Sequence, residues 1–211
     1  MTDRPEKPPQ KRKSRIQTRN RETILNAALD VFSAQGFRGA TLDQIAEASG
    51  LSKANLLYYF PSKEAIHNEL LTALLRDWLE PLREMNPDGE PLAEVMGYMR
   101  RKLVLSRDFP RESRLFANEI LQGAPRVRDA LYQELRPLVE ERARVIQAWM
   151  KKGLLAPCDP VHLIISIWAM TQHYADFDIQ VRAVIGPDHD PYEEAEIFLE
   201  AMFSRLLTPR A

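Results

Sequence analysis

The stretch TLDQIAEASGLSKANLLYYF, residues 41–60, decides the fold of this chain. Thr41 and Gln44 have the spacing of a capping box, in which two side chains satisfy backbone N–H groups at the start of a helix. Gly50 suits the left-handed conformation that ends such a helix, and Ser52 is a favoured cap for a second one over residues 53–60. Two short helices joined by so tight a turn cross steeply, so the stretch predicts a helix-turn-helix.

The residues on either side complete a three-helix domain over residues 18–64. Upstream, one apolar stripe with helical spacing predicts an amphipathic helix that begins near Thr18 and ends at Gly36: Leu25, Ala28, Leu29 and Phe32. Downstream, the sequence PSKE at 61–64 opens a longer helix that runs toward Pro81.

The remaining residues, 65–211, predict a larger helical domain. Breakers divide it into helices near 91–107, 110–122, 124–152, 160–183 and 191–207, with a kink expected at Pro137. No stretch alternates convincingly as a strand does. The predicted fold class is therefore all-α, with an N-terminal helix-turn-helix domain and a C-terminal domain for ligand binding and dimerisation.

Charge is distributed unevenly over the 211 residues, although the net charge is only −1. Residues 1–63 hold eleven Lys/Arg and six Asp/Glu, so this part carries +5 and the remainder −6. A basic head suits contact with a polyanion; the alternative is a solvated basic tail that binds nothing. Residues 1–17, rich in cations and proline, are expected to form a disordered basic arm.

Several classes of protein are excluded by what the sequence lacks. It has no apolar run long enough to span a membrane and no secretory signal, and Cys158 is its single cysteine. We therefore expect a soluble, cytoplasmic protein with no membrane partner and no internal disulfide. No nucleotide-binding, zinc-protease or serine-hydrolase motif is present, and the four histidines are dispersed. The prediction is a non-enzyme with no metal and no cofactor.

The helix that begins after Ser52 has the composition of a DNA-reading helix. Polar residues near its N-terminus can reach base edges in the major groove, tyrosine hydroxyls can donate to phosphates, and helix N-termini attract phosphate oxygens. The alternative is a purely structural three-helix domain with half-buried tyrosines. The candidate DNA contacts are Thr41, Ser52, Lys53, Ala54, Asn55, Tyr58, Tyr59 and Lys63.

An extended pattern in this domain resembles the DNA-binding domain of the TetR family of bacterial transcriptional regulators. The matching residues are Ile24–Ala28, Phe32, Gly36–Phe37, Gly39, Thr41–Ala46, Gly50–Lys53, Leu56–Phe60 and Ser62–Glu64. The resemblance implies a homodimeric repressor that binds a double-stranded DNA operator. Leu57 stands where many members carry a tyrosine, so the phosphate contact of that tyrosine would pass to Tyr58 or be absent.

The chain is also similar, from the end of this domain into the larger one, to one branch of the family, whose regulator controls pyrimidine utilisation and responds to uracil and thymine. The similar segments are 56–65, 78–82, 106–110, 113–116, 123–125, 155–157 and 167–177. They imply a small planar effector, uracil or thymine. Two alternatives stay open: a repressor of an amphipathic drug or acyl ligand, and a helical enzyme or adaptor with an incidental helix-turn-helix.

Trp168 and Gln172 are the first candidates for the effector site, because residues i and i+4 share one helix face. A planar ring could stack on the indole while the carboxamide pairs with the ring's carbonyl and N–H groups. Trp78 lies on the helix that follows the DNA-binding domain, and Lys102, Asn118 and Glu119 are further polar candidates. The alternative is that the tryptophans are core packing.

The last helix carries the predicted dimer surface. Its apolar stripe could pair with a second copy in a four-helix bundle, or be buried within one chain. The residues of the stripe are Ala195, Phe198, Leu199, Met202 and Leu206.

Overall fold

A computed structural model describes the backbone of residues 10–209 and the side chains of residues 15–209. This part of the chain is helical and contains no strand. It forms two compact units, Met1–Leu70 and Leu71–Ala211, which are described separately below. The boundary lies six residues beyond the one expected from the sequence.

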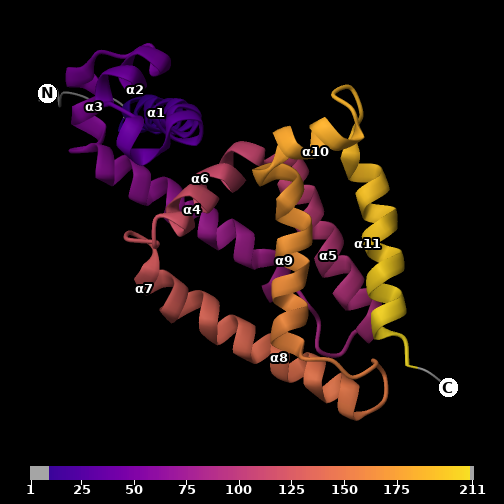
Figure 1. Ribbon diagram of the computed structural model, residues 1–211. Coiled ribbons are helices and arrows are strands. Elements are labelled where there is room, and N and C mark those ends of the chain that lie inside the picture. Colours follow the sequence, from indigo (N-terminus) through magenta and orange to yellow (C-terminus); the bar gives the residue numbers. More distant parts are fainter. Residues whose placement is uncertain (1–9, 210–211) are drawn as a thin grey trace, which may run out of the picture. The chain divides into compact units, whose positions relative to one another are not determined.

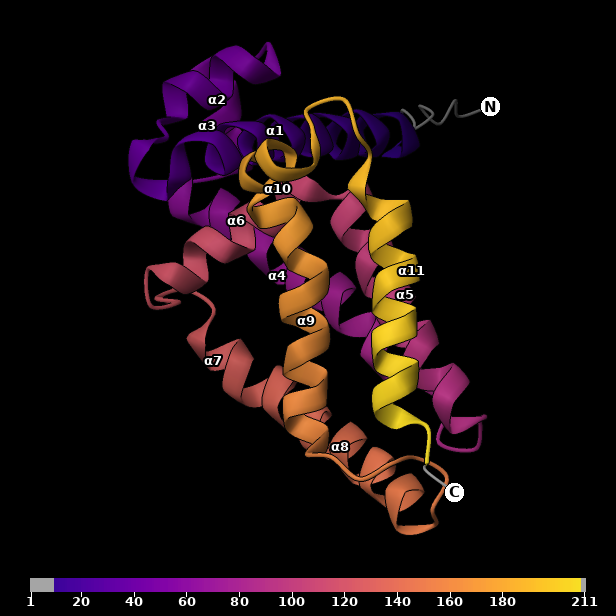
Figure 2. The ribbon, with the colours of Figure 1, turned by 45° about the vertical axis from the view of Figure 1, so that its right-hand side comes forward.

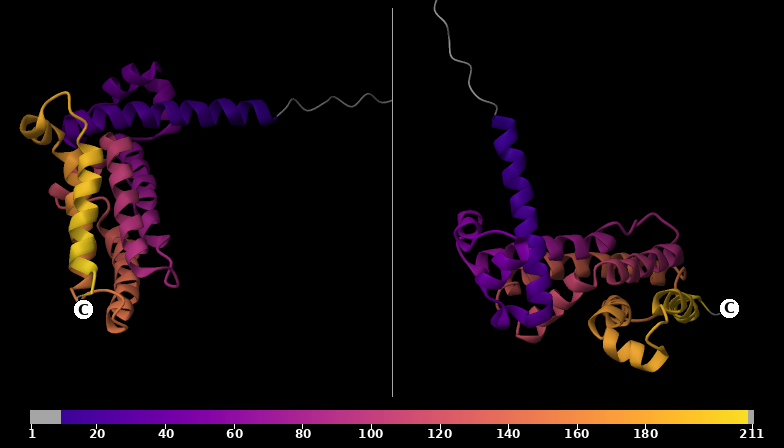
Figure 3. Two further views of the ribbon diagram at one scale, coloured as in Figure 1. Left: turned by 90° about the vertical axis from the view of Figure 1, so that its right-hand side faces the viewer. Right: turned by 90° about the horizontal axis from the view of Figure 1, so that it is seen from above.

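The first unit contains α1 (Gln10–Gly39), α2 (Leu42–Ser49), α3 (Lys53–Tyr59) and the first turns of α4 (Lys63–Arg83). α1 begins at Gln10 rather than near Thr18, so residues 10–17, which we expected in a disordered arm, extend a long helix (Figure 3). Residues 1–9 of the expected arm lie outside the described part. Gly36, with φ 68° and ψ 172°, kinks α1 near its end.

The predicted helix-turn-helix is present in this unit. Thr41 and Gln44 form both halves of the capping box, and Gly50 ends α2 in the left-handed region with φ 67°. Ser52 caps α3 by accepting from the backbone N–H of Asn55. Fully buried apolar side chains from every helix of the unit form its core: Ile24, Ala28, Phe32, Ile45, Leu56, Phe60 and Ile66.

The second unit is built around α5 (Pro91–Asp108), which packs against α9 (Pro160–Asp176) and α11 (Pro191–Leu207). Figures 1 and 2 show α9 and α11 running alongside α5. α9 also contacts α6 (Pro110–Leu121) and α8 (Arg136–Lys151). A short helix, α10 (Asp178–Ile185), links α9 to α11.

Two helices expected from the sequence are interrupted. The region 124–152 contains α7 (Arg128–Ala130), the π-helical turn η1 (Leu131–Leu135) and then α8. Pro137, at the start of α8, has no N–H for the carbonyl of Gln133, so the regular α pattern is broken in the preceding turn. The region 160–183 is divided at Phe177, whose φ of −117° and ψ of 32° end α9. Ala175 is the last buried residue of α9, and Ile179, four residues further on, is exposed. The chain therefore leaves the core between these two residues.

No helix in the described part of the chain is long and apolar enough to cross a membrane.

Candidate nucleic-acid interface and ligand cavity

α3 presents a polar face to solvent because its apolar residues anchor it from the other side. Leu56 and the following Phe60 are buried, whereas Lys53, Ala54 and Tyr58 are exposed, Tyr58 by 71%. Asn55 and Tyr59 are half-buried, and Thr41 and Ser52 occupy the exposed starts of α2 and α3. The outward face of α3 thus carries the side chains expected to meet DNA.

An ion pair between α2 and α3 holds the side chain of Lys53. Its Nζ lies 2.9 Å from Asp43 Oδ2, and both side chains are at least half exposed. Exposed pairs of this kind contribute about 0–1 kcal/mol. Lys53 can therefore exchange Asp43 for a phosphate or a base edge at small cost.

The two tyrosines of α3 are fixed by each other and by α1. Their rings meet edge to face with centroids 5.1 Å apart. Asn20 Nδ2 donates to the Tyr59 hydroxyl at 3.0 Å, and Gln17 Nε2 approaches the Tyr58 hydroxyl at 3.5 Å. Both hydroxyl oxygens act as acceptors here, which leaves their protons available for donation to a phosphate.

Lys63 has a structural role that the sequence did not predict. Its Nζ donates to the carbonyl oxygens of Phe37 and Ala40, both at 2.7 Å, and lies 4.4 Å from the centroid of the Phe37 ring. The kink at Gly36 leaves carbonyls at the end of α1 without helical partners, and the lysine satisfies them. Lys63 therefore caps α1, and its predicted contact with a flanking DNA strand stays a prediction, since the ammonium keeps a third N–H for a phosphate.

The second unit contains a cavity of about 620 Å³ bounded by α4, α5, α6, η1 and α9. Five of the six predicted effector contacts line it: Trp78, Lys102, Asn118, Trp168 and Gln172. Glu119 does not. Its buried carboxylate accepts from the Arg126 backbone N–H at 2.7 Å and pairs with Arg126 Nη1 at 3.1 Å. Successive helical residues point about 100° apart, so Asn118 faces the cavity and its neighbour faces the core.

Lys102 places a buried, titratable amino group on the cavity wall. Its side chain is 2% exposed, and its Nζ lies 4.1 Å from the centroid of the Trp78 ring. Among the described residues its Nζ has the Trp78 ring as a neighbour and no hydrogen-bond or ion-pair partner. Burial lowers the pKa of Lys102 to about 7, against the opposing effect of the Asp176 charge.

Asp176 faces the same cavity and was not identified from the sequence. Its carboxylate accepts a hydrogen bond from the Ser113 hydroxyl. Burial raises the pKa of Asp176, while that hydrogen bond and the nearby Arg114, Lys102 and His173 oppose the rise. The available signal was spacing, because Trp168, Gln172 and Asp176 recur every four residues on α9.

Tyr98, one turn before Lys102 on α5, orients the indole of Trp168. The Trp168 Nε1–H donates to the Tyr98 hydroxyl, and burial raises the pKa of Tyr98 above its usual range. On the α4 side, Phe116 stacks against Trp78 with centroids 6.4 Å apart and an interplanar angle of 29°. The cavity therefore has aromatic walls that are held in place, with Lys102, Gln172 and Asp176 among them.

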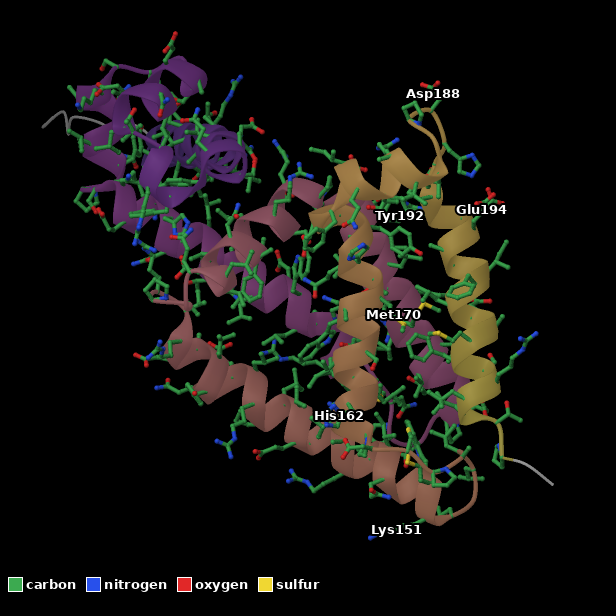
Figure 4. All side chains as sticks on the ribbon, viewed as in Figure 1. Lys151, His162, Met170, Asp188, Tyr192 and Glu194 are labelled. Carbon is green, nitrogen blue, oxygen red and sulfur yellow. The ribbon has the colours of Figure 1, made fainter. Side chains whose placement is uncertain are left out.

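The predicted dimer stripe on α11 divides into two sides. Leu199 is 2% exposed and belongs to the core of the unit with Ala195, so its assignment to a dimer interface is corrected. Phe198 and Leu206 are exposed, and Met202 is half-buried. Figure 4 labels Glu194 on α11 and the exposed Met170 on the neighbouring α9. Phe198 follows Glu194 by one turn, so the outward stripe of α11 starts at that glutamate.

Comparison with known proteins finds a matching family model for each of the two units. Residues 24–70 match the model of bacterial regulatory proteins of the tetR family, and residues 71–210 match the YcdC-like C-terminal region. The HTH-type transcriptional regulator RutR of Escherichia coli K12 is 52% identical over 175 residues, which cover 83% of this chain and 82% of RutR.

Two solved structures share the fold at low sequence identity. A TetR-like regulator from Rhodococcus sp. RHA1 has a TM-score of 0.65 at 21% identity, covering 88% of this chain and 94% of that one. AibR, solved in complex with isovaleryl coenzyme A and operator DNA, has a TM-score of 0.64 at 18% identity and covers 90% of this chain and 100% of its own. The family models cover both units and the identity to RutR is high; the chain is therefore a transcriptional regulator that belongs to the TetR family.

Proposed function

We propose that this regulator is a homodimeric repressor that reads its operator with α3 and leaves it when a pyrimidine such as uracil or thymine occupies the cavity. TetR regulators bind operator DNA and effector ligands. The observation that carries the choice of effector is the convergence of Trp78, Trp168, Gln172 and Lys102 on one cavity. It supports the pyrimidine effector that the resemblance of the body segments implies.

The chemistry of these groups matches the edges of a pyrimidine imide. A carboxamide offers two donors and one acceptor, so Gln172 can pair with an adjacent N–H and carbonyl of the ring. The ammonium of Lys102 has no hydrogen-bond partner among the described residues and can donate to the second carbonyl. The indoles of Trp78 and Trp168 offer flat surfaces for stacking.

α4 supplies the connection between the cavity and the DNA-binding unit. It begins at Lys63, which caps α1, and carries Trp78 fifteen residues later. In a dimer, two recognition helices enter successive major grooves when they are about 34–36 Å apart. A ligand that displaces Trp78 would tilt α4 and change this separation, which weakens binding to DNA.

The outward stripe of α11, together with Met170 of α9, is the surface proposed for the dimer. Phe198, Met202 and Leu206 recur every four residues on it. Its polar start at Glu194 and its apolar middle resemble the rim and core of a protein interface.

The effector is tested by titrating uracil into a complex of the full chain with an operator selected from random DNA. Fluorescence anisotropy of the labelled DNA should report release, and Gln172→Leu should lose the response while keeping its affinity for DNA. Leu154→Ala, at an exposed loop residue outside the cavity, is the matched control and should respond as the natural chain does. No change in DNA affinity up to millimolar uracil contradicts the proposed effector.

The DNA-contact assignment is tested with Lys53→Ala and Tyr58→Ala. Each should cost about 1–3 kcal/mol of operator binding, and loss of a phosphate contact should reduce the salt slope by about one. Lys151→Ala, at an exposed residue of α8 that Figure 4 labels, is the control and should leave binding unchanged. Natural affinity in both α3 variants would show that α3 is not the reading element.

A further inference from the structure

The cavity is much larger than a free pyrimidine base. Uracil has eight non-hydrogen atoms, which fill about 240 Å³ even at the roughly 30 Å³ that each water molecule takes in the liquid. More than half of the 620 Å³ would then stay empty around a bound uracil. A ligand that fills this cavity therefore has more non-hydrogen atoms than uracil.

The polar groups of the cavity lie mainly on α5, α6 and α9. Lys102 on α5 and Gln172 and Asp176 on α9 supply donors and acceptors, and the bond from Ser113 to Asp176 ties this region to the start of α6. Most of the aliphatic lining comes from α4 and η1, and α6 adds Ala117, Ile120 and Leu121; the residues from α4 and η1 are Leu75, Leu79, Leu82, Leu131 and Leu135.

An ion pair joins the two segments that carry these leucines, α4 and η1. Glu134 of η1 pairs with Arg83 at the end of α4, with 3.7 Å between Oε2 and Nη2. Leu135 follows Glu134 directly, and Leu79 and Leu82 lie in the last two turns of α4. In Figure 1 the α7–α8 segment runs along the lower side of the second unit, whereas Asp176 ends α9 at the opposite end, where α10 begins.

Leu131 and Leu135, which line the cavity, are only half-buried, so part of their apolar surface faces water. Apolar surface left facing water has a cost that a covering apolar group removes, and each methylene buried in this way improves affinity about fourfold. π-helical turns such as η1 also occur frequently at functional sites.

We infer that the effector of this chain is a pyrimidine imide that carries an apolar substituent of several carbons, with the ring at Lys102, Gln172 and Asp176 and the substituent against the leucines of α4 and η1. The inference rests on the proposed function and narrows its class of ligand. Thymine, with one methyl group, would leave most of the leucine surface uncovered.

Calorimetric titration of the full chain with uracil and with 1-butyl-, 5-butyl- and 6-butyluracil tests the inference, because the three isomers carry the chain from different ring positions. At least one isomer should bind at least about tenfold more tightly than uracil. Leu135→Gln and Leu131→Gln should each remove most of this gain and keep the affinity for uracil within about twofold. Leu154→Gln, outside the cavity, is the matched control and should keep the gain.

The outcomes separate the inference from the proposed function. If uracil binds and no isomer binds more tightly, the apolar subsite is overturned and the pyrimidine effector stands. If neither uracil nor any isomer binds, both are overturned. A gain that persists in both leucine variants, each folded by circular dichroism, overturns the placement of the substituent. Butylbenzene lacks the imide, and equal affinity for it would overturn recognition of the ring.

Discussion

The ammonium of Lys102 makes the stability of this protein depend on pH. Its folded-state pKa of about 7 lies below the value of ~10.4 expected in the unfolded chain. Between these values the unfolded state binds a proton that the folded state does not, so the free energy of unfolding rises with pH. The penalty of burying the charge is complete below pH 7 and disappears toward pH 10.

Replacing this lysine with an apolar residue should therefore stabilise the fold most at low pH. We expect Lys102→Met to raise the free energy of unfolding by about 1–4 kcal/mol near pH 6.5, and by much less near pH 9.5. Urea unfolding at both pH values measures the difference. Lys151→Met on the exposed face of α8 is the control, with no pH-dependent difference expected. A gain for Lys102→Met that is equal at both pH values contradicts the assignment.

Individual site residues could be predicted where local spacing decides their direction. The four-residue spacing of Trp168 and Gln172 placed both on the cavity, and the same rule extended by one step gives Asp176. The capping role of Lys63 could not be predicted because its partners, the carbonyls of Phe37 and Ala40, become available only through the kink at Gly36. Such a partner is distant in the sequence and leaves no pattern in it.

The end of α1 depends on the side chain of one lysine from α4. Lys63→Met keeps the aliphatic stem but removes two hydrogen bonds from the ammonium to backbone carbonyls. We expect it to lower the free energy of unfolding by about 1–3 kcal/mol, because the half-buried carbonyls lose their donors. Lys53→Met removes the exposed pair with Asp43 and should cost at most about 1 kcal/mol. Chemical denaturation compares the two, and equal losses would argue against a capping role for Lys63.

Helix interruptions could be predicted from the sequence in part. Capping residues gave the limits of α2 and α3 because a cap is a local interaction. Pro137 predicted a distortion within 124–152, but the form of the distortion, the π turn η1, depends on how Leu131 and Leu135 pack. The division at Phe177 likewise follows from where the core ends, which no local pattern reports.

At the scale of the whole molecule, the helical architecture followed from hydrophobic periodicity and breakers, because each helix buries one stripe. The stripe on α11 shows where this reasoning stops. Periodicity grouped Phe198 and Leu199 together, yet one is 63% exposed and the other is in the core. Adjacent residues of a helix point about 100° apart, so a broad stripe can serve both an intrachain core and an outer surface.

The outward residues of the α11 stripe predict where two copies of the chain meet in a dimer. Phe198→Glu places a charge in the middle of the proposed dimer surface, where it would be desolvated without a partner, so the variant should dissociate to a monomer at concentrations where the natural chain is a dimer. Light scattering after size exclusion measures the mass. Tyr132→Glu alters a residue of η1 with the same exposure of 63% and should leave the dimer intact.

The monomeric Phe198→Glu variant should also bind a palindromic operator much more weakly, because binding of one DNA-binding domain no longer raises the effective concentration of the other. A dimeric Phe198→Glu variant would place the interface on another face of the molecule.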